Sequence, residues 1–377
     1  MKRVPVFLEE EFDMPSKFRA IGFAAFLGIM VLIFTAVSPK LAGETAQKEK
    51  GEGGKYGKYF IFDTPSIQLP PEEAAKMKEA QKKGKLTEEL NYFLGLDGTR
   101  LQGAPYMSFV WLWKGSAGGY SEREHVHNFD EFIGFIGTRG PEDPHGLGGE
   151  AEFWLGGEKY LLTKSCLVYV PKGMKHCPVR FSRIDSPILF FTGSFQTGEA
   201  KYEAAATEFN DTKAAERNFA KYISYNVNPK KAPPTDPDAR RKMEEMRQKS
   251  GSTIESARIL DLDSVQGAPY IDFVWMYKGY EKNTTHPEHA HEWGEIFGFI
   301  GSVGQNDLHS LGGEVEFWVD GEKHVLHKSC LVWIPPNLPH CPVRFAQIDK
   351  PILWFTIGIG MKGGGYTFSK PPADKKQ

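Results

Sequence analysis

The sequence has little net charge and few cysteines. Its 46 lysine and arginine residues almost balance 48 aspartate and glutamate residues, a formal charge of −2 over 377 residues. A chain so balanced offers no broad cationic surface for nucleic acid, so we expect no nucleic-acid partner. Aromatic residues, by contrast, make up 13% of the chain. They concentrate in two repeated blocks, which favours large side chains filling two domain interiors.

Charge is absent altogether from one stretch, Ala20–Ser38. Nineteen helical residues would span roughly 28 Å, close to the hydrocarbon thickness of a bilayer. A soluble amphipathic helix would show a polar stripe, and this segment has none. We therefore expect a membrane anchor with the rest of the chain outside the cytoplasm. The alternative is a cleaved signal peptide with an exported product, although Ala36–Ser38 followed by Pro39 is a poor cleavage site.

Metal-ligand chemistry is suggested by the stretch from Gly119 to Glu131. His125 and His127 would share one face of a strand, because side chains alternate sides. Glu131 lies four residues further on and can return to that face after a short bend. Downstream, the segment from Pro171 to His176 supplies a third imidazole. Neutral imidazoles with one carboxylate suit a divalent transition metal.

The same pattern occurs a second time. His289, His291, Glu295 and His340 follow the first set at a constant offset of 164 residues. The offset holds without insertion from the block that begins at Gly103 to the end of the repeat. A period this long indicates a duplicated domain rather than a solenoid. We expect about two metal ions per chain.

These motifs resemble those of the cupin superfamily. Gly119, His125, His127 and Glu131 fit its first motif, G-x5-H-x-H-x3,4-E, and residues 171–176 fit its second, P-x-G-x2-H. The second copy departs at Asn283 and Asn337, which replace glycines. The resemblance implies an all-β bicupin, with two tandem jelly-roll-like antiparallel barrels, short flanking helices and 3-His-1-Glu metal sites. It favours Fe(II) or Mn(II), with Ni(II) and Zn(II) as alternatives.

This reading divides the chain into seven segments. In order they are a tail at 1–19, the anchor or signal segment at 20–38, a linker at 39–58, the first cupin domain at 59–196, a linker at 197–220, the second cupin domain at 221–365 and a tail at 366–377. Charged helices are expected near 70–85 and 236–249, either over the barrels or exchanged between the halves. Gly156-Gly157 and Asp320-Gly321 predict two-residue hairpin turns.

Several other repeated residues leave alternatives open. His145 and His309 lie in matching loops, where a solvated loop histidine is favoured over a substrate-facing role. Arg180 and Arg344 could clamp an anion or form structural ion pairs with Glu152 and Glu316. The histidines without a partner in the first copy are expected at the surface; they are His286, His324 and His327.

The four cysteines form two matching pairs, Cys166 with Cys177 and Cys330 with Cys341. Each pair would lie roughly opposite across two strands of a hairpin. An exported chain could carry disulfides there, but cross-strand bridges are geometrically demanding. Two small buried thiols in each half are equally compatible with the sequence.

A metal-dependent enzyme acting on a small anionic organic molecule is the leading functional hypothesis. The family implies dioxygenase-type oxidoreductase or decarboxylase chemistry, although no acidic lid motif assigns oxalate chemistry, and no residue besides the metal ligands can be given a catalytic role. The alternative is a non-catalytic, membrane-tethered cupin that binds or senses a small ligand or metal. The absence of a separate signalling domain disfavours it. Association into a homo-oligomer stays open.

Overall fold

The computed structural model describes residues 54–64, 90–98, 100–113, 124–197, 202–203, 218–232 and 234–360. Within these ranges no helix is long and apolar enough to cross a membrane. The proposed anchor, most of the linker after it and the first charged helix lie outside the described residues. What is described is mostly antiparallel β-structure, as the sequence predicts.

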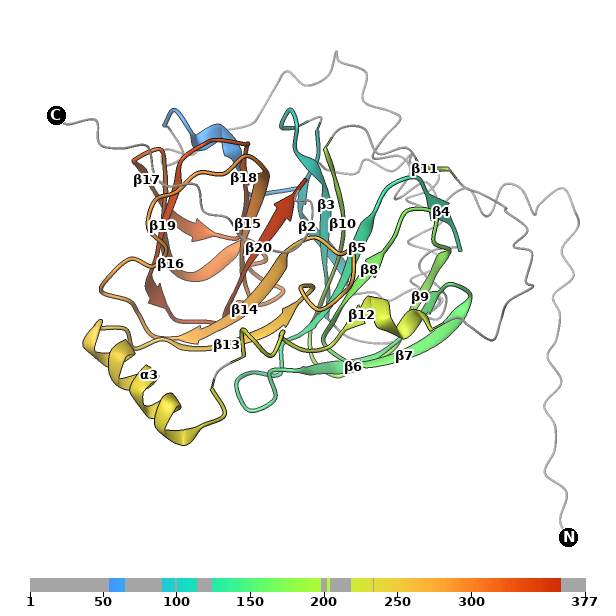
Figure 1. Ribbon diagram of the computed structural model, residues 1–377, viewed down its shortest axis with the longest axis horizontal. Coiled ribbons are helices and arrows are strands. Elements are labelled where there is room, and N and C mark those ends of the chain that lie inside the picture. The colour runs from blue at the N-terminus through green and yellow to red at the C-terminus, as the bar shows by residue number, and fades with distance from the viewer. Residues whose placement is uncertain are drawn as a thin grey trace, which may run out of the picture.

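The first barrel pairs a large sheet with a small one (Figure 1). The large sheet has the order β12-β8-β5-β10-β3-β2, built from β2 (Leu90–Leu96), β3 (Pro105–Leu112), β5 (Glu131–Gly137), β8 (Cys166–Val170), β10 (Ile188–Thr197) and β12 (Ile223–Ser224). The small sheet has the order β7-β6-β9, built from β6 (Gly146–Leu155), β7 (Glu158–Lys164) and β9 (His176–Ile184). A short pair, β4 (Val126–His127) with β11 (Tyr202–Glu203), lies beside them.

The second barrel repeats this plan. Its large sheet has the order β1-β18-β15-β20-β14-β13, built from β1 (Phe60–Ile61), β13 (Glu255–Asp261), β14 (Ile271–Lys278), β15 (Gly294–Gly301), β18 (Cys330–Ile334) and β20 (Ile352–Ile359). Its small sheet has the order β17-β16-β19, built from β16 (Ser310–Val319), β17 (Glu322–Lys328) and β19 (His340–Ile348). In each barrel a hydrophobic core fills the space between the two sheets.

The two halves of the chain exchange their first strands. β1 comes before the first barrel in sequence, yet it pairs with β18 of the second barrel, Phe60 opposite Val332. β12 follows the first barrel and adds to it instead, with Ile223 opposite Val168. Figure 1 shows both short strands against the barrel of the other half. Neither barrel completes its large sheet with residues from its own half alone.

A third hydrophobic cluster lies between the two large sheets and joins the barrels. Its centre is a group of four phenylalanine rings, two from each half, namely Phe109, Phe191, Phe273 and Phe355, with neighbouring centroids 4.7–5.6 Å apart. Since the core of each barrel covers the other face, these strands are buried on both faces and read as continuous apolar runs. Gly298 makes room for one ring, because an added Cβ would lie 1.9 Å from a ring carbon of Phe355.

Local predictions from the sequence are largely confirmed. Gly156 and Gly157 join β6 to β7 with φ of +63° and +84°, and Asp320 and Gly321 join β16 to β17 with φ of +48° and +75°. Positive φ at both central residues is the type I′ geometry that matches strand twist. The second charged helix forms as α3 (Pro237–Lys249), with the Asp236 side chain accepting from the first-turn amides. Short 3-10 turns precede the exchanged strands, η1 (Gly57–Tyr59) and η3 (Phe219–Tyr222).

Of the two alternatives for the cysteines, disulfides or buried thiols, the structure has buried thiols. None of the four cysteines forms a disulfide, and all four are buried. Burial raises the pKa of the Cys166 and Cys341 thiols, because the thiolate would lose its hydration. Cys166 and Cys341 therefore pack as small apolar groups, and neither of the two matching pairs is bridged.

Candidate metal centres

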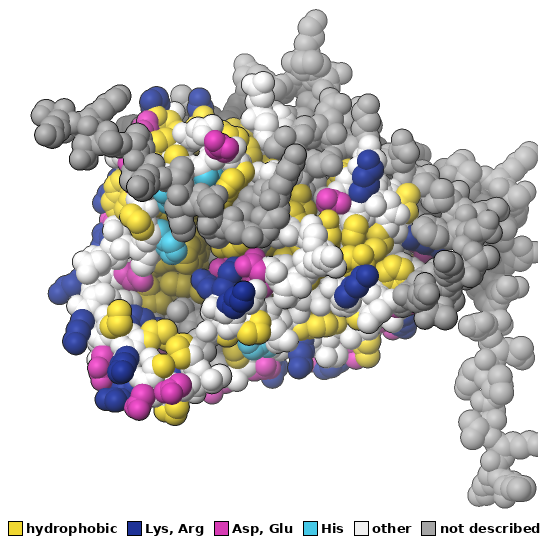
Figure 2. All heavy atoms as spheres, viewed as in Figure 1, with side chains coloured by type: hydrophobic (Ala, Val, Ile, Leu, Met, Phe, Trp, Pro, Cys, Tyr) yellow, Lys and Arg dark blue, Asp and Glu magenta, His cyan; other side chains and the backbone are white. Residues whose placement is uncertain are grey.

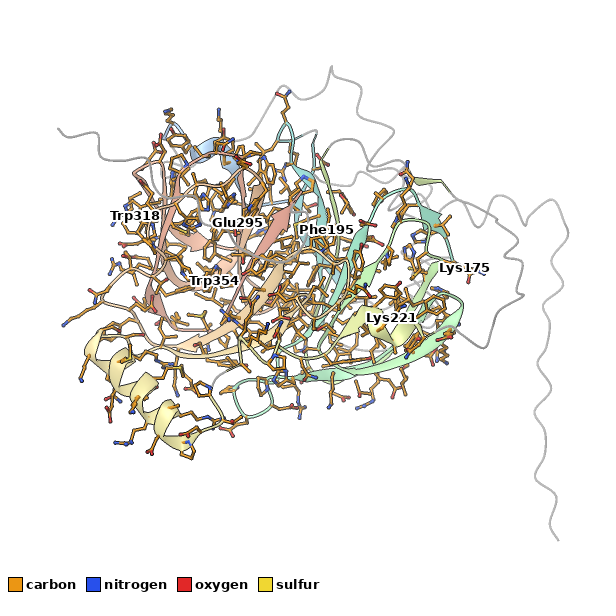
Figure 3. All side chains as sticks on the ribbon, in the orientation of Figure 1. Lys175, Phe195, Lys221, Glu295, Trp318 and Trp354 are labelled. Carbon is orange, nitrogen blue, oxygen red and sulfur yellow. The ribbon has the colours of Figure 1, made fainter. Side chains whose placement is uncertain are left out.

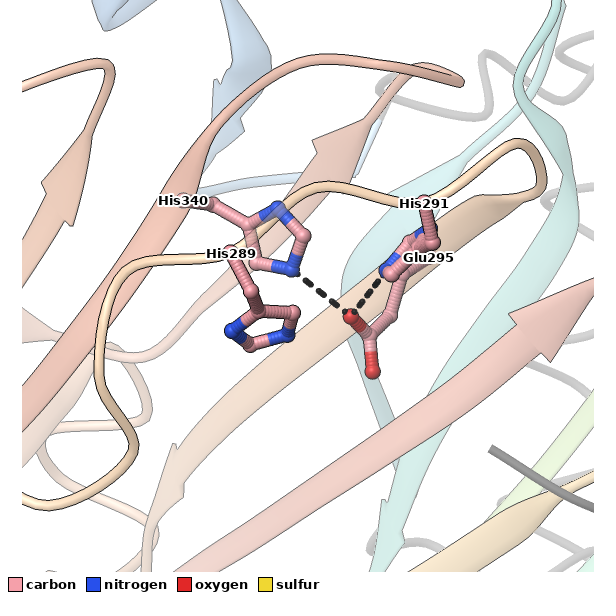
Figure 4. Close-up of side chains that lie close together, drawn as sticks. All are labelled: His289, His291, Glu295 and His340. Carbon is pink, nitrogen blue, oxygen red and sulfur yellow. Dashed lines mark hydrogen bonds and ion pairs between the residues drawn. The ribbon is translucent and has the colours of Figure 1, made fainter. Parts of the chain in front are cut away.

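Four predicted residues of the second copy converge inside the second barrel (Figure 4). The ligand atoms of His289, His291, Glu295 and His340 all lie within 4.8 Å of one another. Glu295 is the second residue of β15, and His340 is the first residue of β19. Backbone hydrogen bonds of 2.9–3.0 Å between His289 and His340 hold the loop before β15 against that strand. Residues far apart in sequence are thus fixed around one point.

The backbone selects which imidazole nitrogen faces that point. In each ring Nδ1 donates to a carbonyl two residues away: His289 to Pro287 at 2.9 Å, His291 to Trp293 at 2.6 Å and His340 to Leu338 at 2.9 Å. A carbonyl only accepts, so each neutral ring carries its proton on Nδ1 and turns the Nε2 lone pair inward. The His291 ring also stacks on Trp293, with centroids 3.5 Å apart and planes 1° from parallel.

The first copy repeats this arrangement. His127 and His176 donate from Nδ1 to the Phe129 and Met174 carbonyls at 2.7 and 2.9 Å. Their Nε2 atoms lie 3.1 and 3.0 Å from Glu131 Oε2. The ligand atoms of His125, His127 and His176 lie within 4.8 Å of one another. The second copy therefore gathers all four predicted residues, and the first gathers three imidazoles with Glu131 beside two of them.

The carboxylates are buried and held in the charged form. Burial opposes ionisation of Glu131, but a proton on the Nε2 atoms of His127 and His176, in the place that a cation would take, outweighs burial and lowers the pKa of the carboxyl. The same balance with His291 and His340 lowers the pKa of Glu295. The side chains of both glutamates are only 3–4% exposed. A buried negative charge of this kind requires a positive partner.

The spacing of the donor atoms fits one ion. Glu295 Oε2 lies 3.1 Å from His291 Nε2 and 3.0 Å from His340 Nε2. Atoms 2.0–2.2 Å from a common metal in an octahedral set would be about 3 Å apart. Without a proton or cation between them, inward lone pairs at this distance would repel. The donor set therefore suits a divalent cation, and metal binding itself stays a prediction.

A cavity of about 200 Å³ opens beside the second cluster. His289 and Glu295 contribute to its wall, as do aromatic residues such as Trp354. Figure 2 shows a hollow over this barrel with histidine at its rim and side chains of both charges beside it. Figure 3 places Glu295 and Trp354 within the second barrel and Trp318 toward its outer side. The candidate centre can therefore be reached by a small molecule.

The loop histidines do not belong to these centres. Glu131 begins β5, and the loop with His145 follows the other end of that strand. Glu131 and this loop are therefore separated by the length of β5, about 20 Å. His309 occupies the matching place and donates from Nδ1 to the Phe62 carbonyl at 3.0 Å. A substrate-facing role is therefore wrong for both. His309 instead helps to fix the segment that carries β1.

The arginines after the second motif form structural ion pairs. Arg180 lies 2.9 Å from Glu152, and Arg344 lies 2.5 Å from Glu316. A regular strand would place Arg344 on the face of His340, but the β16–β19 register shifts between Phe317 and Val319. Arg344 therefore points to the outer face, away from the candidate metal centre. The anion-clamp alternative is wrong.

The three unmatched histidines have different environments. His327 is exposed, with 64% of its side chain accessible, as predicted. His286 is exposed but also lines the cavity beside the second cluster, with its ring 5.4 Å from that of Trp354. The surface prediction is wrong for His324, whose ring packs on Phe60 at 4.3 Å and is 9% exposed. Strand exchange covers it, and the sequence could not show that exchange.

Other polar residues of the cavity were missed by sequence reasoning. Lys231, Arg258 and Asp272 line it together with the cluster residues. Asp272 interrupts the aromatic and aliphatic run of β14 (Ile271–Lys278), and a carboxylate in such a run is a usable signal. Lys231 lies in the connection between the halves, where nothing in the sequence marks it.

Comparison with known proteins gives only distant likenesses. No protein-family model and no curated relative matches the chain. Similar solved structures include AerE from Microcystis aeruginosa, with 10% identity over 80% of this chain and 99% of that chain and a TM-score of 0.39. Oxalate decarboxylase from Bacillus subtilis shares 12% identity over 76% of each chain, with a TM-score of 0.42. Salicylate 1,2-dioxygenase from Pseudaminobacter salicylatoxidans shares 14% identity over 91% of this chain and 93% of that chain, with a TM-score of 0.36.

At these identities and TM-scores, none of the three assigns an activity to this chain. The duplicated motif, the two antiparallel barrels and the cluster inside each of them belong to the chain itself. Together they show the fold that the resemblance implies, two tandem antiparallel barrels with a cluster of imidazoles inside each.

Proposed function

We propose that this chain is a metal-dependent bicupin enzyme for a small anionic organic substrate, with dioxygenase-type or decarboxylase chemistry. The second cluster carries the proposal, because His289 and Glu295 lie in the wall of a cavity of about 200 Å³. A purely structural metal site is usually closed by its protein ligands, whereas a catalytic one keeps an open position. Three imidazoles and one carboxylate beside a cavity leave such a position.

The residues around the cavity divide into metal-binding and substrate-binding groups. His289, His291, Glu295 and His340 would hold a divalent ion, with Fe(II) or Mn(II) favoured. Once bound, the ion would stabilise negative charge on a coordinated oxygen. Arg258 and Lys231 line the same cavity and would attract a carboxylate. Apolar side chains, including Trp354 and Phe297, would exclude water from the rest of the substrate.

Turnover is the test. The full-length chain, reconstituted with Fe(II) or Mn(II), would be incubated with a panel of aliphatic and aromatic carboxylic acids that includes oxalate and salicylate. Oxygen consumption reports dioxygenase chemistry, and carbon dioxide release without oxygen consumption reports decarboxylation. We expect turnover that Glu295→Gln abolishes and that His327→Ala, at the exposed surface, preserves. Saturable binding without turnover would instead support the non-catalytic alternative.

A further inference from the structure

Asp272 lies in the wall of the cavity beside the second cluster, and one of its carboxylate oxygens has no hydrogen-bond partner among the described residues. The residue is 6% exposed and lines the same cavity as His289 and Glu295. Its Oδ2 lies 3.1 Å from Arg258 Nη2 and accepts from the Tyr270 hydroxyl at 3.4 Å. Its Oδ1 is buried without a hydrogen-bond partner among the described residues. Since an orphaned buried oxygen is costly, a ligand in the cavity is the natural partner.

The sheet register aims Asp272 toward the cluster. Asp272 on β14 pairs with Thr356 on β20, which pairs with Phe297 on β15, two residues beyond Glu295. Thr356 and Phe297 also line the cavity, so this row forms the inner face of the sheet. Two strand spacings separate β14 from β15, or about 10 Å. A small substrate fits between an ion held by the cluster and the Asp272 carboxyl.

The charges around Asp272 favour proton exchange. Burial raises its pKa above the ordinary value, Arg258 and Lys231 lower it, and Asp261 and Asp263 raise it again. Asp261 is the cross-strand neighbour of Asp272 on β13. Lys231 pairs with Asp263 at 2.5 Å. A buried carboxyl with a raised pKa is suited to hold and return a proton.

The described strands of the first barrel carry other residues at the equivalent positions. Ser108 occupies the place of Asp272, as the sequence offset of 164 requires. Tyr92 takes the place of Arg258, because it pairs with Val110 where Arg258 pairs with Val274. Gly95 takes the place of Asp261, because it pairs with Ser108 where Asp261 pairs with Asp272. Duplication has therefore kept the imidazole and carboxylate ligands in both barrels, whereas the Arg258 and Asp272 pair is present in the second alone.

We propose that the second barrel is the reaction centre and that Asp272 is its acid–base residue, with Arg258 as a positioning residue. This inference rests on the function proposed above. The Asp272 carboxylate takes a proton from an acidic group of the bound substrate. The bond to that hydrogen breaks, its electron pair stays on the substrate, and an O–H bond forms on the carboxyl. The same proton returns to the product, so no further reactant is needed.

Kinetics of position-matched variants test the role. Asp272→Asn keeps the shape of the side chain, and Ser108→Ala alters the equivalent position of the first barrel. We expect Asp272→Asn to lower kcat by at least about 100-fold, with the metal content unchanged, and to remove one limb of the pH profile. Asp272→Glu should restore part of the rate, and Ser108→Ala should stay within about twofold of wild type. A kcat for Asp272→Asn within about threefold of wild type, or an unchanged pH profile, would overturn the proposal.

A second measurement needs no substrate. Aspartate side chains labelled with ¹³C at the carboxyl would be observed by NMR, with Asp272 assigned by the signal lost in Asp272→Asn. Mn(II) would then be added to Glu131→Gln, which keeps the second cluster, and to Glu295→Gln, which keeps the first. We expect Mn(II) to broaden the Asp272 signal only in Glu131→Gln. Equal effects in both variants would overturn the placement of Asp272 at the second centre. Absence of wild-type turnover would overturn the proposed function, and the NMR result would then decide the placement of Asp272 alone.

Discussion

Single backbone carbonyls determine the chemistry of each cluster. The motif predicts which residues meet, but the contact between Nδ1 and a carbonyl two residues away decides which nitrogen faces inward. The carbonyl of Trp293 fixes His291, and the Trp293 ring also stacks on that imidazole. A residue at a variable position of the motif thus helps to orient a ligand. Metal-bound histidines are typically held by such outer contacts.

The carboxyl of Glu281 predicts that the stability of the fold depends on pH. Burial raises the pKa of its carboxyl from 4.5 to about 7, against smaller effects of the Phe345 amide and Arg247. In the unfolded chain the group ionises near its ordinary value, so the folded protein binds the proton more tightly. Stability from this group is complete below about pH 4.5 and is lost as the pH rises toward 7. Because the side chain is partly exposed, we expect a loss of about 1–2 kcal/mol.

Denaturant unfolding of wild type and Glu281→Gln at pH 5 and pH 8 measures this loss. Relative to wild type, the unfolding free energy of Glu281→Gln should be about 1–2 kcal/mol greater at pH 8 than at pH 5. Since other titrating groups are shared, the difference isolates Glu281. An equal difference at both pH values would show that this carboxyl does not titrate in the folded state as predicted.

The sequence predicts residues well where they form a local motif and poorly where a distant segment decides. His291 and Glu295 lie four positions apart, so their meeting follows from a strand and a bend. The burial of His324 depends on Phe60, which lies 264 positions earlier. Arg344 leaves the ligand's face because of a register shift that no residue type announces. Asp272 was overlooked because no motif includes it.

At the level of elements, the exchange of β1 and β12 and the four-ring cluster join the halves. The short strands give each barrel two backbone-paired residues from the other half. The rings add direct contact between β10 and β14, since Phe191 and Phe273 stack with centroids 5.3 Å apart. Strand identity, hairpin turns and α3 follow from local sequence, whereas pairing between halves does not. The repeat in sequence is equally compatible with two independent barrels.

The ring cluster predicts a measurable coupling. Phe273 is fully buried, so Phe273→Ala should cost about 3–5 kcal/mol of unfolding free energy. Tyr280→Ala, at an exposed aromatic residue, should cost about 0.5 kcal/mol or less. A double-mutant cycle with Phe191→Ala should show about 0.5–1.5 kcal/mol of interaction across the halves. Strict additivity of the two substitutions would mean that the rings do not couple the barrels.

At the scale of the whole molecule, duplication has produced two similar centres with different surroundings. Each barrel gathers three imidazoles and has a glutamate beside two of them. The second adds Arg258 and Asp272 and receives Lys231 from the connection between halves. Ser224 of that connection pairs in the first barrel and donates to the Asp261 carbonyl of the second at 2.8 Å. The link that completes one barrel therefore also helps to position the cavity of the other.

Location is a further prediction at this scale. We propose that residues 20–38 hold the chain in a membrane with both barrels outside the cytoplasm. The run is uncharged, and each ionised residue at the bilayer centre would cost about 2.5–3.5 kcal/mol on insertion scales. Cell fractionation with carbonate washing and protease access in intact cells test it. Recovery in the soluble cytoplasmic fraction would refute the anchor, and a shortened exported chain would favour signal cleavage.

The most direct test of the central claim is the metal content of the full-length chain after reconstitution with Fe, Mn, Ni and Zn. We predict about two equivalents for wild type, about one for either Glu131→Gln or Glu295→Gln, and almost none for the double variant. Substitution of His145 or His309 should weaken retention less, because both lie away from the clusters. A wild-type content below about half an equivalent, or greater losses from the loop histidines than from the glutamates, would contradict the account.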